Sequence, residues 1–365
     1  MLKRHPWLPL YLSLLITLII WGAAIFNLTP DDYQQAALES DTLFARLIEP
    51  WNHWDTPFYL SIAENWYSPG GAEISFPPVY AILVGALGRI LGGAYLPASL
   101  LISWVSLAIA CALIYDEFQA YTDAESSLRA VKYLLIFPTA FFFFAGYTES
   151  IFLVFLVLAM RGARKEIWWQ AGMFGLLASM TRFIGIFVAI PFAWIWFQKP
   201  LKEKVRIAAW LSPIPIVFLG WIWLTDKLYG LNPISAGLKF WYIKTDWPWV
   251  GLFGSIKSLI EEPKFFGNYQ YADVLSVFLF MAAVIYAFRK KWIPEALFMG
   301  SLMVVFLIKV LEFDLLISTS RYVLVLYPSF LLLAEWGKKK WFDVAWSILS
   351  VVYMFQLSIF FFVGK

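Results

Sequence analysis

The sequence is poor in the side chains on which disulfide, thiol and metal chemistry depend. Its single cysteine, Cys111, lies inside an apolar run, so the chain can form neither an internal disulfide nor a cysteine-based metal site. Its two histidines, His5 and His53, are too few for a cluster of histidine ligands. Charged residues make up only 15% of the chain, and the net charge of +3 comes from short basic loops, which gives no indication of a nucleic-acid partner.

Hydrophobic residues, by contrast, make up 61% of the 365 residues, in long runs that recur from end to end. This composition predicts an all-α polytopic membrane protein, with one integral domain over residues 1–365 and no separate soluble domain. The 20 tryptophans and 18 tyrosines suit a protein with much surface at the membrane interface. Residues 7–26 are too long for a removed signal peptide and lack its cleavage site, which predicts a permanent first span.

The positive-inside rule orients the apolar runs. Basic loops fall on the cytoplasmic side if the chain has eleven spans, at about 7–26, 94–115, 131–145, 149–160, 168–181, 183–197, 207–224, 273–288, 294–312, 321–336 and 342–363. The outer loops are then about 27–93 and 225–272. The first of these is strongly acidic, with Arg46 as the only base over residues 27–75. For the basic loops to stay cytoplasmic, residues 77–92 have to form an interfacial or re-entrant helix rather than a further span.

The acidic outer loop contains an aromatic stretch that begins near Asp55. Asp55 and Pro57 have the pattern of a helix start, with Asp at the N-cap and Pro in the first turn. Phe58, Ile62 and Trp66 then recur every four residues, which predicts a helix with an aromatic face lying in the membrane interface. Asp55 is either held at the membrane surface for chemistry or is a simple helix cap, and the spacing leaves both interpretations open.

Further polar residues converge on the same outer face in this topology. Glu149 lies in a tight turn, Arg182 at the tip of a short hairpin, and Arg321 at the start of a late span. Ionisable groups at membrane depth usually face a cavity or a partner, so two carboxylates and two or three cations suit acid/base chemistry on an anionic lipid head group. The alternatives are that Glu149 caps a helix and that the arginines are snorkelling anchors.

Several motifs, in order, resemble those of one family. Residues 53–64, His-Trp-Asp-Thr-Pro-Phe-Tyr-Leu-Ser-Ile-Ala-Glu, resemble the Arg-Trp-Asp-x-x-x-Tyr-x-x-Ile-Ala motif of the PIG-V-like mannosyltransferases, which are GT-C membrane glycosyltransferases. The agreement extends over most of the chain, to Phe76-Pro77-Pro78-Val79-Tyr80, Phe137-Pro138-Thr139-Ala140-Phe141, Tyr147-Thr148-Glu149-Ser150, Thr181-Arg182, Asn232-Pro233, Ser320-Arg321-Tyr322 and Tyr327-Pro328. His53 departs from the family pattern, which usually has arginine there.

The resemblance implies a GT-C-type helix bundle whose first outer loop carries a catalytic carboxylate. It also implies a polyprenyl- or dolichyl-phosphate sugar as donor, most often mannose, and leaves the acceptor open among glycolipid, glycan and protein. The site is expected on the non-cytoplasmic face of an integral membrane protein, in the plasma or inner membrane of a prokaryote or the endoplasmic reticulum of a eukaryote. A groove for the polyprenyl chain is expected beside residues 77–92, with Phe76 and Tyr80.

We therefore predict an inverting glycosyltransferase in which Asp55 is the general base. Glu149 orients the acceptor or, with Asp55, holds Mg²⁺ or Mn²⁺, although a monophosphate donor does not require a metal. The expected ligands of the donor phosphate are Arg321, Arg182, His53 and Tyr322. The expected substrate contacts are Trp54, Tyr59, Tyr147, Asn232 and Lys239. The competing interpretation is a transporter or flippase of a lipid-linked sugar, which requires paired broken helices and polar groups near the mid-membrane.

Overall fold

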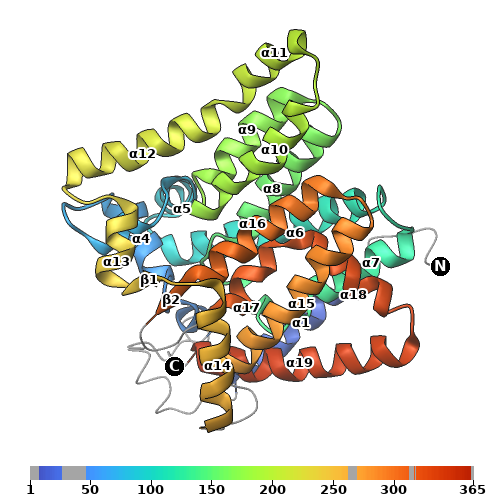
Figure 1. Ribbon diagram of the computed structural model, residues 1–365. Coiled ribbons are helices and arrows are strands. Elements are labelled where there is room, and N and C mark those ends of the chain that lie inside the picture. The colour runs from blue at the N-terminus through green and yellow to red at the C-terminus, as the bar shows by residue number, and fades with distance from the viewer. Residues whose placement is uncertain (1–7, 27–46, 262–268, 312–315, 317, 363–365) are drawn as a thin grey trace.

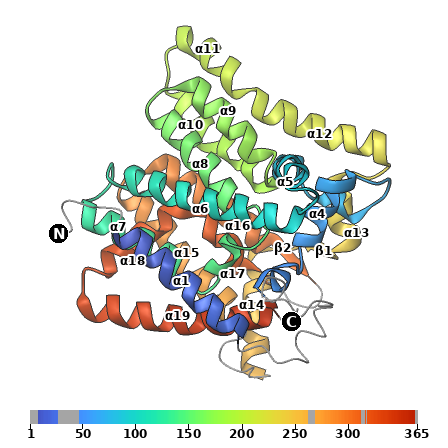
Figure 2. The same cartoon turned by 180° about the vertical axis from the view of Figure 1, so that it is seen from behind.

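The computed structural model describes residues 8–26, 47–261, 269–311, 316 and 318–362. Within these ranges the chain is helical apart from loops and one short two-stranded sheet. Figures 1 and 2 show the helices packed into one bundle, with α11 and α12 along one edge and α1 and α19 along the opposite edge.

The elements of the first half run from α1 to α10. They are α1 (Leu8–Phe26), η1 (Glu49–Trp51), α4 (Thr56–Asn65), η2 (Ala72–Ser75), α5 (Pro78–Ile90), α6 (Tyr95–Phe118), α7 (Ala124–Leu135), η3 (Ala140–Phe143), α8 (Glu149–Arg164), α9 (Trp168–Ser179), η4 (Phe183–Val188) and α10 (Ala189–Phe197).

The second half contains the sheet as well as helices. Its elements are α11 (Leu201–Leu211), α12 (Pro213–Tyr229), α13 (Pro233–Phe240), β1 (Ile243–Thr245), α14 (Pro248–Glu261), α15 (Tyr269–Arg289), α16 (Ile293–Ile308), β2 (Lys309–Leu311), α17 (Thr319–Tyr322), η5 (Val323–Val325), η6 (Tyr327–Ser329), α18 (Phe330–Trp336) and α19 (Lys340–Phe362). Strands β1 and β2 pair antiparallel, with Thr245 opposite Lys309.

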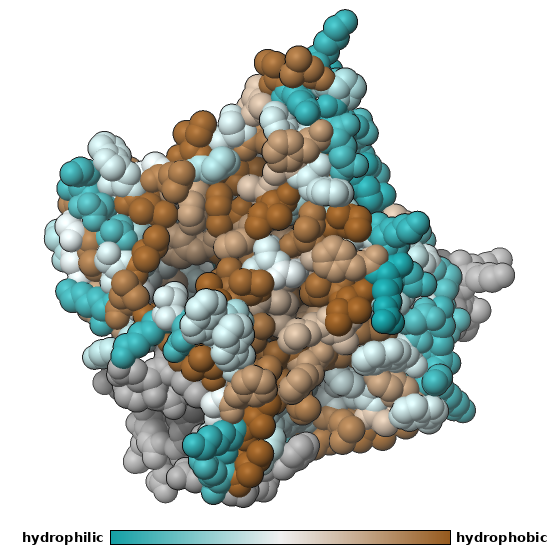
Figure 3. All heavy atoms as spheres, viewed as in Figure 1, coloured by the Kyte–Doolittle hydropathy of each residue, from teal (hydrophilic) through white to brown (hydrophobic). Residues whose placement is uncertain are grey.

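Four helical segments within the described residues are long and apolar enough to cross a membrane. They are α6, the continuous stretch Leu201–Tyr229 of α11 and α12, α15 and α19. Large apolar side chains of α15 are exposed on the outside of the bundle, among them Leu275 and Phe278. Figure 3 shows a broad hydrophobic area across the middle of this face, with hydrophilic residues gathered beside it. The prediction of an all-α membrane protein is confirmed, whereas the number of spans stays a prediction.

Helix α5 corresponds to the segment that was expected not to cross. Its 13 residues extend about 20 Å at ~1.5 Å per residue, which is shorter than the ~30 Å hydrocarbon core. It packs on α4 at a close approach, because a Cβ at Gly85 would lie 2.7 Å from the Ala63 carbonyl oxygen. Helix α4 begins at Thr56 as predicted but ends at Asn65, so Trp66 does not continue its aromatic face. Trp66 instead donates its indole N–H to the Tyr229 hydroxyl at 3.0 Å.

The prediction of a continuous helical span over 131–145 was wrong. Helix α7 ends at Leu135, and the chain continues through the Phe137-Pro138 step into η3. A residue before proline is pushed out of the helical conformation, which explains the break. The segment nevertheless runs alongside α19. At one end Lys132 pairs with Asp343, near the start of that helix. Farther along, Phe142 contacts Phe361 near its end.

The predicted span over 321–336 is also broken, into α17, η5, η6 and α18, with Pro328 at the break. Non-helical backbone is tolerated at membrane depth only where protein covers it, and the residues from Val323 to Leu333 are buried. Two further boundaries differ from the prediction. The expected span 294–312 ends as helix α16 at Ile308, because residues 309–311 form β2. The described part of the outer loop 225–272 contains α13, β1 and α14 rather than a plain connection.

Helix α6 connects two polar ends of the bundle. Near its start, Ser103 donates to the Tyr147 carbonyl oxygen at 3.1 Å, and Tyr147 in turn contacts Asp55. At its other end, Glu117 pairs with Arg164. We call these the Asp55 end and the Glu117 end.

Candidate active site

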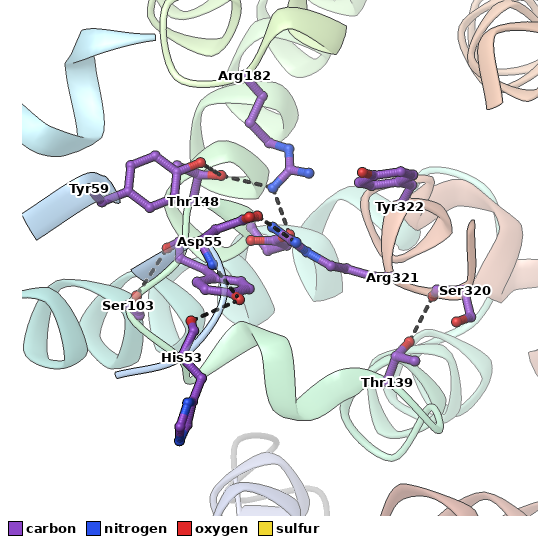
Figure 4. A network of polar contacts seen from close by, with 12 residues as sticks. His53, Asp55, Tyr59, Ser103, Thr139, Thr148, Arg182, Ser320, Arg321 and Tyr322 are labelled. Carbon is purple, nitrogen blue, oxygen red and sulfur yellow. Dashed lines mark hydrogen bonds and ion pairs between the residues drawn. The ribbon is translucent and has the colours of Figure 1, made fainter. Parts of the chain in front are cut away.

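Four charged side chains from distant parts of the sequence meet at the Asp55 end (Figure 4). Arg321 donates from Nη1 to Asp55 Oδ2 and from Nε to Glu149 Oε1, both at 2.6 Å. Arg182 Nη1 lies 2.6 Å from the same Glu149 oxygen and donates to Thr148 Oγ1 at 2.8 Å. The pairs therefore connect Asp55, Arg321, Glu149 and Arg182 in series, and we call this set the ion-pair chain.

The members of the ion-pair chain differ in exposure. The side chain of Glu149 is 0% exposed and that of Arg321 is 8% exposed, whereas that of Asp55 is 21% exposed. Both arginines thus lie in buried ion pairs instead of snorkelling outward. Buried charges are tolerated when they are paired and hydrogen-bonded, which these are. Asp55 is therefore the more exposed carboxylate of the ion-pair chain.

The backbone around Asp55 explains how the carboxylate is presented. Asp55 precedes α4, but its side chain makes no capping hydrogen bond to that helix. The interpretation of Asp55 as a simple cap was therefore wrong, because its Oδ2 accepts from Arg321 instead. Trp54, just before it, has a positive φ of 58°, an uncommon conformation for a bulky residue. Strained backbone of this kind often occurs at functional sites.

The Tyr147 hydroxyl holds this backbone in place. Its hydroxyl accepts from the Asp55 N–H at 3.1 Å and donates to the His53 carbonyl oxygen at 3.3 Å. The Arg321 guanidinium carbon lies 4.3 Å from the centre of the Tyr147 ring, a cation–π contact. Gly146 lets the backbone before Tyr147 pack closely against Ser99 of α6, since a Cβ there would lie 2.6 Å from Ser99 Oγ.

A cavity of about 270 Å³ opens beside the exposed carboxylate. Part of its lining is charged and polar, with Asp55, Arg182, Arg321, Lys309 and Tyr322. The rest of the lining is mainly aromatic and apolar. It includes Tyr59, Phe76, Pro77, Phe183, Trp241 and Phe306. Such a mixture of a large apolar lining with a few convergent polar groups is typical of small-molecule sites.

Some predicted site residues line the cavity and others support it from outside. Arg321, Arg182, Tyr322, Tyr59 and Asp55 are at its wall. Glu149 and Tyr147 are buried behind it and touch the arginine or the backbone of the wall. Of the residues expected beside a lipid groove, Phe76 lines the cavity. Tyr80 is fully buried and bonds to the Ser99 carbonyl oxygen instead.

His53 points away from the ion-pair chain, and Trp54 lies outside the cavity wall. Figure 4 shows the His53 ring on the far side of the Asp55 backbone, and its ring lies near Phe361. Burial lowers the pKa of the His53 imidazole from its usual value, which favours the neutral ring at pH 7. The phosphate contact of His53 stays a prediction. Trp54 is about half exposed and does not line the cavity.

The two residues predicted from the second outer loop lie outside the cavity wall. Asn232 caps α13 by accepting from the Ser235 N–H at 3.0 Å, and its amide donates to Asp226. Lys239 is exposed, with its amine 4.8 Å from the centre of the Phe240 ring. The cavity is instead lined by their neighbours Pro233, Gly237 and Trp241.

Two residues of the site were not anticipated from the sequence. Thr148 Oγ1 accepts from Arg182 and lies 3.4 Å from the Tyr59 hydroxyl. Lys309 lines the cavity and donates to the Tyr322 hydroxyl at 2.8 Å. A signal for Lys309 was present, because it is an isolated cation within the apolar run 294–312, and such residues usually have a functional partner.

The two carboxylates do not form an open metal site. The Arg321 guanidinium lies between them and bonds to both. Within the described ranges, no group of three or more His, Cys, Asp or Glu side chains is placed to hold a metal ion. In this arrangement Arg321 takes the place between Asp55 and Glu149 that a shared cation would need, and Mg²⁺ or Mn²⁺ at this pair stays an untested prediction.

Comparison with known proteins gives matches of structure but not of sequence. No family model matches the chain, and no curated protein matches it by sequence. It is similar in structure to ArnT from Cupriavidus metallidurans bound to undecaprenyl phosphate, with 12% identity and a TM-score of 0.49 over 99% of this chain and 76% of ArnT.

The chain is also similar to the oligosaccharyltransferase of Archaeoglobus fulgidus. In the complex with zinc and sulfate, the identity is 13% and the TM-score 0.49, over 97% of this chain and 53% of that one. In the apo form, the identity is 11% and the TM-score 0.47, over 100% of this chain and 57% of that one. The chain thus spans about half the length of this protein. Similarity at this level carries no information about activity, which has to follow from the chain's own residues.

Proposed function

We propose that this protein is an integral membrane glycosyltransferase. It moves a sugar from a polyprenyl-phosphate donor to the hydroxyl of an acceptor, with inversion at the anomeric carbon. The observation that carries the proposal is the accessible Asp55 carboxylate, which lines a cavity together with Arg182, Arg321 and Lys309. A base next to several cations suits a reaction in which a hydroxyl attacks and a phosphate leaves.

The reaction assigns a role to each group at the cavity. Asp55 takes the proton from the acceptor hydroxyl while the acceptor oxygen forms a bond to the anomeric carbon. The bond between that carbon and the phosphate oxygen breaks, and the oxygen keeps the electron pair. Proton transfer to a positioned base contributes about 10²–10⁴-fold to such a rate. Arg321 fixes the orientation of the base through its contact with Asp55 Oδ2.

Glu149 acts in this proposal as a positioning residue rather than as a catalyst. It is fully buried, and its Oε1 is shared by Arg321 and Arg182. A single carboxylate thus sets the position of both guanidinium groups at the cavity wall. The phenol of Tyr147 acts similarly, because it bonds to the backbone on both sides of Trp54.

The finer features of the proposal rest on sequence. The resemblance to the PIG-V-like mannosyltransferases makes mannose the expected sugar and a GT-C bundle the expected architecture. Basic loops such as Lys338-Lys339-Lys340 adjoin the end of the bundle opposite Asp55, since Asp343 pairs there with Lys132. The positive-inside rule makes that end cytoplasmic. The cavity would then open on the periplasmic, extracellular or luminal face.

The test is transfer of radiolabelled sugar by the purified full-length protein, with a panel of polyprenyl-phosphate donors and acceptor lipids. Asp55→Asn should lower the transfer rate by about 10²–10⁴-fold while the protein still binds polyprenyl phosphate. Glu64→Gln is the matched control, because Glu64 is an exposed carboxylate on the same helix, α4, and should transfer at the wild-type rate. Equal activity in Asp55→Asn and wild type would rule out Asp55 as the base.

A transporter of lipid-linked sugars is the second candidate, favoured by the interruptions of the helical segments at Pro138 and Pro328. The surroundings of the breaks argue against it. Phe137 packs on Phe330 and Tyr327 on Phe118, so aromatic rings cover both breaks. In liposomes, movement of labelled lipid across the bilayer without transfer to any acceptor would favour the transporter.

A further inference from the structure

The charges at the cavity wall divide into a compensated group and an uncompensated one. Asp55 and Glu149 are paired with Arg321 and Arg182, which gives two negative and two positive charges. Lys309 also lines the cavity, but its amine donates to the uncharged Tyr322 hydroxyl at 2.8 Å. Among the described residues, no carboxylate lies within ion-pair distance of Lys309. Within the described part of the chain, the wall therefore carries one positive charge that has no carboxylate partner.

The position of Lys309 is fixed by backbone pairing. It is the first residue of β2 and lies opposite Thr245 of β1, at the point where α16 ends. Its partner is equally constrained, because the Tyr322 ring stacks on Phe306 with 5.5 Å between ring centres. A pair of groups preorganised in this way loses little conformational freedom when a ligand binds.

We propose that Lys309 Nζ and the Tyr322 hydroxyl bind the phosphate group of the lipid-linked donor. This inference rests on the proposed function and names the part of the cavity that recognises the leaving group. The donor N–H groups of Arg321 that face Asp55 and Glu149 are already engaged. Lys309 has two further ammonium hydrogens besides the one directed to Tyr322, and it adds the positive charge that a phosphate requires.

The charge balance of the transfer supports this assignment. The donor is a phosphate diester with one negative charge, and the released polyprenyl phosphate is a monoester that gains a second charge as the carbon–oxygen bond breaks. The proton lost by the acceptor goes to Asp55, so one negative charge moves from Asp55 to the phosphate. A fixed cation at the phosphate stabilises this developing charge without reorganisation of solvent. Arg321 remains with Glu149 throughout.

The experiment measures binding of polyprenyl phosphate, the released product, to the purified full-length protein in detergent. Lys309→Met should weaken this binding by about 10- to 100-fold, the range for loss of one hydrogen bond to a charged group. Tyr322→Phe should weaken it by less, and Lys309→Arg should restore most of it. The matched control is Lys257→Met, because Lys257 is an exposed lysine on α14 away from the cavity.

The possible outcomes separate this inference from the proposed function. Wild-type-like binding in Lys309→Met would overturn the role of Lys309 while leaving the transferase intact. Failure of the wild type to bind polyprenyl phosphate would overturn the proposed function itself. Equal competition by inorganic phosphate would show that a free anion, not a lipid head group, is the ligand. If Lys309→Met does not fold, the affinities of Lys309→Arg and Tyr322→Phe for polyprenyl phosphate are compared instead. Weaker binding in Tyr322→Phe than in Lys309→Arg would support the role of this pair, and wild-type binding in both would overturn it.

Discussion

The two polar ends of the bundle use the same residue types in different ways. At the Glu117 end, Arg164 donates to both oxygens of Glu117, at 2.8 and 2.6 Å, so one cation satisfies one carboxylate. At the Asp55 end, Arg321 is divided between two carboxylates, and Glu149 Oε1 is shared by two arginines. The Glu149 Oε2 atom is buried and has no hydrogen-bond partner within the described structure.

This difference separates a bidentate ion pair from a set of shared ion pairs. A bidentate arginine–carboxylate pair is geometrically complete and holds helices together. In the ion-pair chain, Arg321 and Glu149 each have two charged partners, and the Asp55 carboxylate is exposed to a cavity. A buried polar atom without a hydrogen-bond partner usually has an explanation other than stability, such as a catalytic role. The comparison therefore predicts that equivalent substitutions at the two ends will affect different properties.

The largest contrast is expected from removal of the arginines. Arg321→Met leaves Asp55 and Glu149 without their shared partner and should lower the stability by about 3–5 kcal/mol, with loss of transfer. Arg164→Met should cost less, because Arg164 is about one-third exposed, and should leave transfer per folded molecule unchanged. Thermal unfolding in detergent and specific activity measure the two effects. Equal loss of specific activity at both ends would contradict the comparison.

A smaller contrast is expected from the tyrosines. The Tyr147 hydroxyl positions the Asp55 backbone, whereas the Tyr121 hydroxyl donates to Glu295 at the Glu117 end, at 2.5 Å. Each Phe substitution should cost about 0.5–3 kcal/mol of stability, since the hydrogen bonds of the hydroxyl are lost. Only Tyr147→Phe should also lower the transfer rate, with little change in donor affinity. A lowered rate in Tyr121→Phe at unchanged folding would show that both ends contribute to activity.

The smallest effect is expected at His53. Burial lowers its pKa in the folded protein, so the unfolded chain, with a pKa near ~6.5, takes up the proton more readily. The stability that the neutral ring contributes is complete above about pH 6.5 and is lost as the pH falls towards the lowered folded-state value. His53→Gln should remove this part of the pH dependence, seen as a flatter melting temperature between neutral and acidic pH.

His53→Gln should also leave the affinity for polyprenyl phosphate unchanged at neutral pH. The lowered pKa favours the neutral ring there, and the ring points away from the ion-pair chain. A tenfold loss of affinity would support His53 as a phosphate ligand and would place the anion near Asp55 rather than near Lys309.

The sequence by itself determined the class of the protein and the residues of the ion-pair chain. Long apolar runs identify membrane helices because the cost of placing polar groups in lipid acts on every segment. For the same reason, ionisable residues such as Asp55, Glu149, Arg182 and Arg321 are conspicuous beside such runs. The start of α4 after Asp55 also followed from local signals, since Pro57 in the first turn acts within a few residues.

Only the tertiary structure decided how these residues are used. Asp55 and Arg321 are 266 positions apart, and no local pattern predicts that one guanidinium bridges two carboxylates or that His53 turns away. Hydropathy does not reveal the breaks at Pro138 and Pro328, because the residues around them are apolar whether they face lipid or lie in the buried core. Lys309 became a site residue through the pairing of β1 with β2. Such pairing depends on contacts between distant segments, and these exist only in the folded chain.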